Sequence, residues 1–144
     1  MQLIRSFEQD LAAPVGLGMR IILLTTEGRD GALARRLAGL GGQVDCHAEM
    51  NAGLAQLIED PYRYGLLVID CDGFGGLQPV RQTCLNLVGQ ADRVPVLMIS
   101  RDCQAQIFPN ALQAPVVLRA PVSAVSLRVG FEHALRERLA LRVN

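Results

Sequence analysis

The sequence predicts an α/β fold, in which a doubly wound, five-stranded parallel sheet carries helices on both faces. The first observation is that five short segments have strand character, and four of them are apolar runs dominated by Ile, Leu, Val and Met. Such runs indicate strands buried on both faces, as in a parallel sheet covered by helices. The second observation is that helical spacing of apolar residues fills the intervals between the runs. Strict alternation of strand and helix predicts right-handed crossovers between parallel strands.

The expected strands differ in their exposure. The segment QVDCHA at residues 43–48 alternates apolar Val44 and Cys46 with polar Asp45 and His47, which is typical of an edge strand. An edge position for the second strand predicts the strand order 2-1-3-4-5, the flavodoxin-like arrangement. The other strands are apolar throughout and are expected at residues 20–25, 65–70, 94–100 and 115–118.

Most of the expected helices are marked by an apolar stripe and a stop signal. The first runs along a leucine stripe and ends at the pair Gly41-Gly42. The segment 102–112 is a poor helix because Pro109 interrupts it. The last helix is amphipathic, with leucines and a phenylalanine on its core side and charged residues on the other. The remaining expected helices cover residues 54–58, 77–88 and 123–141.

Length and composition fit one folded domain. The chain has 144 residues, of which 50% are apolar and 19% are charged. This composition can form a proper core and excludes an intrinsically disordered chain. We expect a short lead segment at residues 1–18, which ends in a cluster of Pro and Gly, followed by one domain at residues 19–144.

Charge and apolar patterning exclude two classes of partner. The formal net charge is zero and the pI is near 6.7, so we expect neither nucleic acid nor an anionic membrane as a partner. The longest apolar runs are about six residues, far short of the roughly 20 that a membrane span needs. All 14 basic residues are arginine. The four cysteines form no CxxC pair, which favours buried thiols and a reducing, cytoplasmic location.

Polar residues gather where the expected strands end. In this fold a site lies at the carboxyl ends of the first and third strands, where the strand order reverses. The carboxylate of Asp70 closes a wholly apolar strand and would project into the crevice, where it can take a phosphoryl group or a divalent cation. The local pattern equally allows Asp70 to cap the following loop or helix. Other candidates at the strand ends are Thr26, Glu27, Asp72 and Ser100.

At these residues the chain resembles the receiver domain of two-component response regulators, over residues 20–142. The resemblance rests on LLVIDCD around Asp70, on VPVLMIS ending in Ser100, and on the proline-led final helix PVSAVSL. It implies that Asp70 is the phosphoacceptor, that the backbone carbonyl of Asp72 holds a metal ion, and that the Ser100 hydroxyl bonds a phosphoryl oxygen. It also implies a role in phosphorelay signal transduction and no enzyme activity.

The metal site departs from the receiver pattern. The acidic pair that holds Mg²⁺ in the family falls on Thr25 and Thr26, with Glu27 one residue away. Neutral hydroxyls do not supply the missing charge, and Mg²⁺ dehydrates reluctantly. We therefore expect any Mg²⁺ site formed by Asp70, Asp72 and Glu27 to be weakened, and no other cofactor is indicated.

The fixed cation of the family is also missing. The position of its lysine falls on Ala120, and the chain has no lysine to replace it. The neighbouring Arg119 would face away on a regular strand, and the aromatic switch residue falls on Val117. Because phosphoryl transfer depends on positioned positive charge, we predict an atypical receiver with weak or no phosphorylation. The alternative is a working phosphoacceptor at Asp70, supported by Ser100, Arg119 and Thr26.

A receiver without chemistry would act by binding. By resemblance, its contacting face is built from the fourth helix, the fifth strand and the last helix, and its partner is a kinase, a downstream effector or a second copy of the chain. Arginine suits interfacial ion pairs, although the same pattern also fits a solvated helix with its own ion pairs. The charged candidates on this face are Arg119, Arg128, Glu132 and Arg136.

Two further functions have weaker support. A small flavin or nucleotide binder is a second alternative, because residues 25–28 are rich in hydroxyl groups like a phosphate-binding loop. Against it, Glu27 places a negative charge where phosphate would bind. Hydrolytic or thiol catalysis would need His47 or His133, and both are expected to be ordinary surface residues.

Overall fold

The sheet has the predicted topology. The structure, a computed structural model, describes residues 18–85, 94–110 and 114–136, so the expected lead segment lies outside the described residues except for Gly18. Within these ranges the sheet is parallel, with the order β2-β1-β3-β4-β5, which confirms the predicted fold class and strand order. The strands are β1 (Arg20–Leu24), β2 (Gln43–His47), β3 (Leu66–Asp70), β4 (Val96–Ser100) and β5 (Val116–Arg119).

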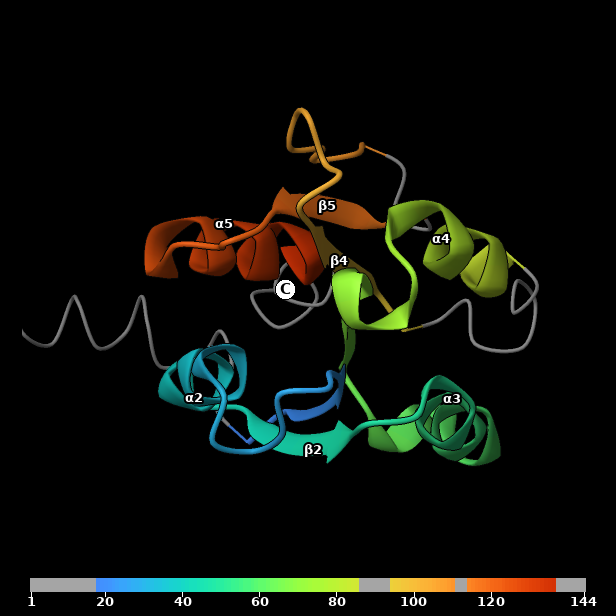
Figure 1. Cartoon of the computed structure of the whole chain (residues 1–144). Coiled ribbons are helices and arrows are strands. Elements are labelled where there is room, and N and C mark those ends of the chain that lie inside the picture. The colour runs from blue at the N-terminus through green and yellow to red at the C-terminus, as the bar shows by residue number, and fades with distance from the viewer. Residues whose placement is uncertain (1–17, 86–93, 111–113, 137–144) are drawn as a thin grey trace, which may run out of the picture.

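Helices cover both faces of this sheet, as Figure 1 shows. One face carries α2 and α5, and the other carries α3 and α4. Among the described residues, none of the helices has the length and apolarity that a bilayer crossing demands. The helices are α2 (Ala32–Gly39), α3 (Met50–Glu59), α4 (Leu77–Leu85) and α5 (Ala124–Ala134), with short 3-10 helices η1 (Pro61–Arg63) and η2 (Cys71–Phe74).

Strand β1 shows why the strand segments are apolar without interruption. Its residues Ile21 and Leu23 point into the core beneath α2 and α5, whereas Ile22 and Leu24 point into the core beneath α3 and α4. All four side chains are fully buried. Because successive side chains on a strand face opposite sides, a strand between two helical layers needs apolar residues at every position.

The expected helix at residues 102–112 is wrong for the described part of that segment. Residues 101–110 form turns and extended backbone, and residues 111–113 lie outside the described residues. Ile107 pairs with Val117 of β5 in an antiparallel bridge, with N···O distances of 2.8 and 3.0 Å. Pro109 has no N–H to donate to a helix, so the chain finds its hydrogen bonds at the edge of the sheet instead.

Helix α5 fastens this connection. His133 Nε2 lies 2.7 Å from the carbonyl oxygen of Pro109, and the Arg136 guanidinium donates to the carbonyls of Pro109 and Asn110 at 2.9 and 2.8 Å. The ring of Phe108 also meets that of His133 edge to face. The expectation that His133 is an ordinary surface residue and that Arg136 faces water is therefore wrong, because both side chains are half-buried and hold the loop.

Candidate functional site

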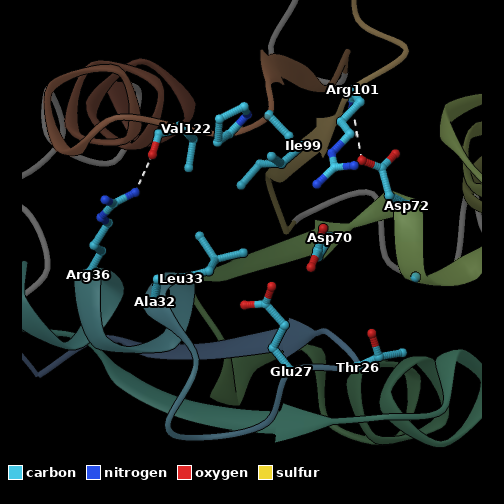
Figure 2. Close-up of a pocket in the computed structure, with 13 residues that line it drawn as sticks. Thr26, Glu27, Ala32, Leu33, Arg36, Asp70, Asp72, Ile99, Arg101 and Val122 are labelled. Atoms are coloured by element: carbon cyan, nitrogen blue, oxygen red, sulfur yellow. Dashed lines mark hydrogen bonds between the residues drawn. The ribbon is translucent and has the colours of Figure 1, made fainter.

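A pocket of about 390 Å³ opens at the carboxyl edge of the sheet, where the ends of β1, β3, β4 and β5 meet (Figure 2). This is the edge at which a doubly wound sheet places its ligands, and the volume lies in the usual range of ligand sites. Carboxylates and one arginine line the side formed by β3 and β4, and apolar side chains line much of the rest. The lining residues are Thr26, Glu27, Ala32, Leu33, Arg36, Asp70, Asp72, Gly73, Ile99, Arg101, Ala120, Pro121 and Val122.

The Asp70 carboxylate lies in the pocket, half-buried at the end of β3. Thr25, which is buried, donates its hydroxyl to Asp70 Oδ2 at 3.1 Å. Burial raises the pKa of Asp70, and the nearby carboxylates of Glu27 and Asp72 add to this, while the Thr25 hydrogen bond and the Arg101 charge oppose it. The capping alternative fails, because Asp70 precedes η2 but its side chain makes no capping hydrogen bond.

The two remaining acids of the pocket are placed differently. In Figure 2 the Glu27 carboxylate points into the pocket towards Asp70. Both oxygens of Asp72 instead accept hydrogen bonds from the end of β4: Ser100 Oγ donates to Oδ1 at 2.7 Å, and the Arg101 backbone N–H donates to Oδ2 at 3.0 Å. The Ser100 hydroxyl thus donates its hydrogen bond to Asp72, whereas the resemblance implied that it bonds a phosphoryl group on Asp70.

Two arginines that sequence reasoning missed reach this pocket. Arg36 extends from α2 and donates to the carbonyl oxygen of Val122. Arg101 follows β4 directly and lines the pocket, and its backbone N–H donates to Asp72 Oδ2. Its position immediately after Ser100, at the end of an apolar strand, was the one sequence signal that could have pointed to it.

Strand β5 itself supplies no cation to the pocket, where the Arg36 guanidinium from α2 bonds the Val122 carbonyl on this side. Ala120 lines the pocket at the position where the resemblance places a lysine. Arg119 is exposed, is not among the pocket residues, and donates its backbone N–H to Gln106 Oε1 at 3.2 Å. The prediction that Arg119 faces away from the crevice is in line with this geometry, since alternate residues of a strand face opposite sides.

The acids fit a magnesium ion poorly. Within the described residues, no three His, Cys, Asp or Glu side chains gather closely enough to hold a metal ion. Glu27 and Asp70 face the pocket, whereas the Asp72 carboxylate is bonded at β4, so a metal ion would have two carboxylates besides the Asp72 backbone carbonyl that the resemblance assigns to it. The Thr26 side chain packs closely against Gly73 of η2. A Cβ atom added to Gly73 would lie only 2.9 Å from the Thr26 hydroxyl oxygen.

The outer face of α5 combines charged and apolar side chains. Arg128 Nε and Glu132 Oε1 form an ion pair at 3.1 Å, one helical turn apart. Two valines of the same helix have exposed side chains: Val125 is 73% exposed and Val129 is 47% exposed. Of the four predicted interface residues, Arg119, Arg128 and Glu132 are accessible in part or whole, whereas Arg136 is engaged with the β4–β5 connection.

Cys71, Cys84 and His47 do not provide a nucleophile at the pocket. Burial raises the pKa of Cys71 to about 12 and that of Cys84 to about 11, so both thiols stay protonated at neutral pH. His47 Nε2 lies 2.7 Å from Gln56 Oε1, away from the pocket residues. This geometry does not support thiol or histidine catalysis.

Comparison with known proteins rests on structure. No protein-family profile matches the chain, and no curated protein sequence does either. A response regulator receiver domain protein from Clostridium thermocellum superposes with a TM-score of 0.64 at 16% identity, covering 85% of this chain and 98% of that one. A response regulator receiver protein from Burkholderia phymatum superposes with a TM-score of 0.54 at 22% identity, covering 85% and 93%. The chain therefore has the fold of a response regulator receiver domain.

Proposed function

We propose that this protein is an atypical receiver in two-component signal transduction, which works in the cytoplasm by protein contact and accepts a phosphoryl group at Asp70 weakly or not at all. The observation that carries the proposal is which residues after and at the end of β5 line the pocket. Ala120 lines the pocket where the family has its lysine, and Arg119 lies outside it. A pocket without that cation has lost the group that would neutralise a transferring phosphoryl.

The magnitude of this loss favours binding over chemistry. One missing electrostatic contact to a developing charge typically costs a factor of about 10²–10³ in rate. Here the lysine is absent, the two residues at the place of the acidic pair are neutral threonines, and the Ser100 hydroxyl is bonded to Asp72. Because catalysis of phosphoryl transfer is almost entirely positioning and charge stabilisation, such losses would leave Asp70 nearly inert.

The test is a ¹⁵N NMR titration with millimolar Mg²⁺ and then beryllofluoride, which mimics an aspartyl phosphate without requiring the protein to catalyse anything. The proposal expects no saturable shift at Thr26, Asp70 or Ser100. Saturable shifts in the wild type that are lost in Asp70→Asn would overturn it and make the chain a phosphoacceptor.

A working phosphoacceptor remains the second candidate because of one observation. Arg101 lines the pocket on the β4 side, and its charge opposes the rise that burial causes in the pKa of Asp70, so it could supply part of the missing positive charge. Under this candidate, beryllofluoride would bind the wild type and bind Arg101→Ala much more weakly. A flavin or nucleotide is disfavoured, because the pocket residues include three acids and no aromatic ring.

The outer face of α5 is the contact surface we propose, with a kinase, an effector or a second copy of the chain as partner. Its support is the pairing of exposed Val125 and Val129 with the Arg128–Glu132 ion pair on the same helix. A second copy is the simplest partner to test, since two antiparallel α5 helices related by a two-fold axis could exchange these charges. Sedimentation velocity over a range of concentrations should then show a dimer that Val129→Glu abolishes, whereas a monomer at every concentration would leave a heterologous partner.

A further inference from the structure

The end of β4 presents a set of donors to a single carboxylate. The Ser100 hydroxyl and the Arg101 backbone N–H each bond one oxygen of Asp72, at 2.7 and 3.0 Å. The Asp102 backbone N–H donates to Ser100 Oγ at 3.1 Å, which orients that hydroxyl. Two convergent donors on the two oxygens of one acid form the arrangement by which proteins bind an external oxyanion.

The Asp72 contact is not a local cap. Asp72 comes from η2, and its partners lie 28 and 29 residues further along the chain. Ser100 is fully buried, whereas Asp72 is exposed, so water and ligands can reach the acid but not the hydroxyl behind it. Arg101 lines the same pocket as Asp70 and Asp72.

We propose that Asp72 is an internal competitor, whose carboxylate occupies the donors at the end of β4 and keeps external oxyanions out of the Asp70 pocket. The ligand class it excludes is a phosphate or carboxylate group. This inference rests on the proposed function, because it explains how a receiver fold can keep its hydroxyl residue and still be closed to a phosphoryl group. Displacement of Asp72 would free the Ser100 hydroxyl and the Arg101 N–H together, and would remove one negative charge near Asp70.

The test compares the wild type with Asp72→Ala in a titration with inorganic phosphate, followed through the ¹⁵N shifts of Arg101 and Asp102. We expect Asp72→Ala to bind phosphate about tenfold or more tighter than the wild type, since two hydrogen-bond donors become free for an ionised acceptor and one negative charge leaves the pocket. Glu27→Gln is the matched control, because it removes a carboxylate from the same pocket without touching the donors of β4. The control should bind as the wild type does.

Each outcome of this titration either supports or overturns the proposal that Asp72 excludes oxyanions. A gain in Asp72→Ala that is absent in Glu27→Gln, with the largest shifts at Arg101 and Asp102, supports the proposal. An equal gain in both variants would assign the effect to overall charge, and no gain in a folded Asp72→Ala would show that Asp72 excludes nothing; either overturns it. If Asp72→Ala does not fold, Asp72→Asn decides, because an amide keeps one acceptor oxygen but loses the charge and the second acceptor.

A last arm separates this inference from the proposed function. In the double variant Asp70→Asn with Asp72→Ala, free phosphate should still bind at β4, since its donors do not involve Asp70. Retained binding supports a site built by Ser100 and Arg101, and lost binding would place the anion elsewhere and overturn the inference. The proposed function fails separately, by beryllofluoride binding to the wild type.

Discussion

The two sides of the pocket are built by different means. The side formed by the ends of β1, β3 and β4 is polar, and its groups bond one another: Thr25 to Asp70, and Ser100 to Asp72. The side formed by the chain between β5 and α5 contributes only apolar side chains, those of Ala120, Pro121 and Val122, and Arg36 reaches it from α2. The strands and the helices that cover them lie beneath both sides, and their apolar cores do not depend on which groups line the pocket. Fold and site chemistry are therefore separable in this molecule.

The largest expected effect lies under the β5 side. Phe131 of α5 is fully buried in the core that includes Leu118 of β5. Phe131→Ala should lower the free energy of unfolding by about 3–5 kcal/mol through lost burial and a cavity. Urea denaturation followed by circular dichroism measures it. Val125→Ala, at a residue 73% exposed on the same helix, is the control and should change stability by no more than about 0.5 kcal/mol. Equal losses in the two variants would contradict the placement of α5.

The next effect concerns the connection that replaces a helix before β5. Arg136 donates to three carbonyls, at 2.7 Å to His133, 2.9 Å to Pro109 and 2.8 Å to Asn110. Arg136→Ala should cost about 1–3 kcal/mol and speed amide exchange at Ile107, whose N–H pairs with Val117. Hydrogen exchange read by NMR would show it. Unchanged protection at Ile107 would mean that the bridge to β5 holds the loop without α5.

On the polar side, Asp70 should make stability depend on pH. Its folded pKa is raised, chiefly by burial, so in the pH range just above the usual aspartate pKa the native state binds more of this proton than the unfolded chain does. The stability that Asp70 contributes is fully present below its unfolded pKa and is lost as pH rises through the folded pKa. Wild type should therefore lose stability relative to Asp70→Asn as pH rises from about 3 to 7. Urea titrations across this range measure the difference, and parallel curves for the two proteins would sink the prediction.

The smallest effect is on the outer face of α5. The ion pair between Arg128 and Glu132 is more than a third exposed on both sides, so Arg128→Ala should cost only about 0.2–0.5 kcal/mol. Thermal unfolding at low salt and at roughly 1 M salt should show the difference shrink, because ions screen exposed charges. A loss as large as that of Arg136→Ala would mean that Arg128 also has a structural role.

Most of the fold could be predicted because burial leaves a pattern in the sequence. The unbroken run of β1 and the alternation of β2 led to the parallel sheet and its order, and these features depend only on which faces are covered. The segment 102–112 could not be predicted in the same way. Its hydrogen bonds go to Val117 and to side chains of α5, and such long-range partners leave no local signal.

The sequence predicted where the candidate site lies, but only part of which side chains meet there. Asp70 lies where the end of an apolar strand placed it, since the carboxyl ends of parallel strands share one edge. That Ser100 turns to Asp72, and that Arg36 and Arg101 reach the pocket, depends on side-chain directions between elements. No spacing along the chain contains that information.

The sequence by itself determined the layered sheet, the edge at which its polar residues meet, and the absence of any lysine from that edge. These follow from apolar periodicity and composition, which act over a few residues at a time. Only the tertiary structure decided which donor meets which acceptor: Thr25 with Asp70, and Ser100 with Asp72. Hydrogen bonds are short and directional, so their pairing is set once the strands and helices have packed, and not before.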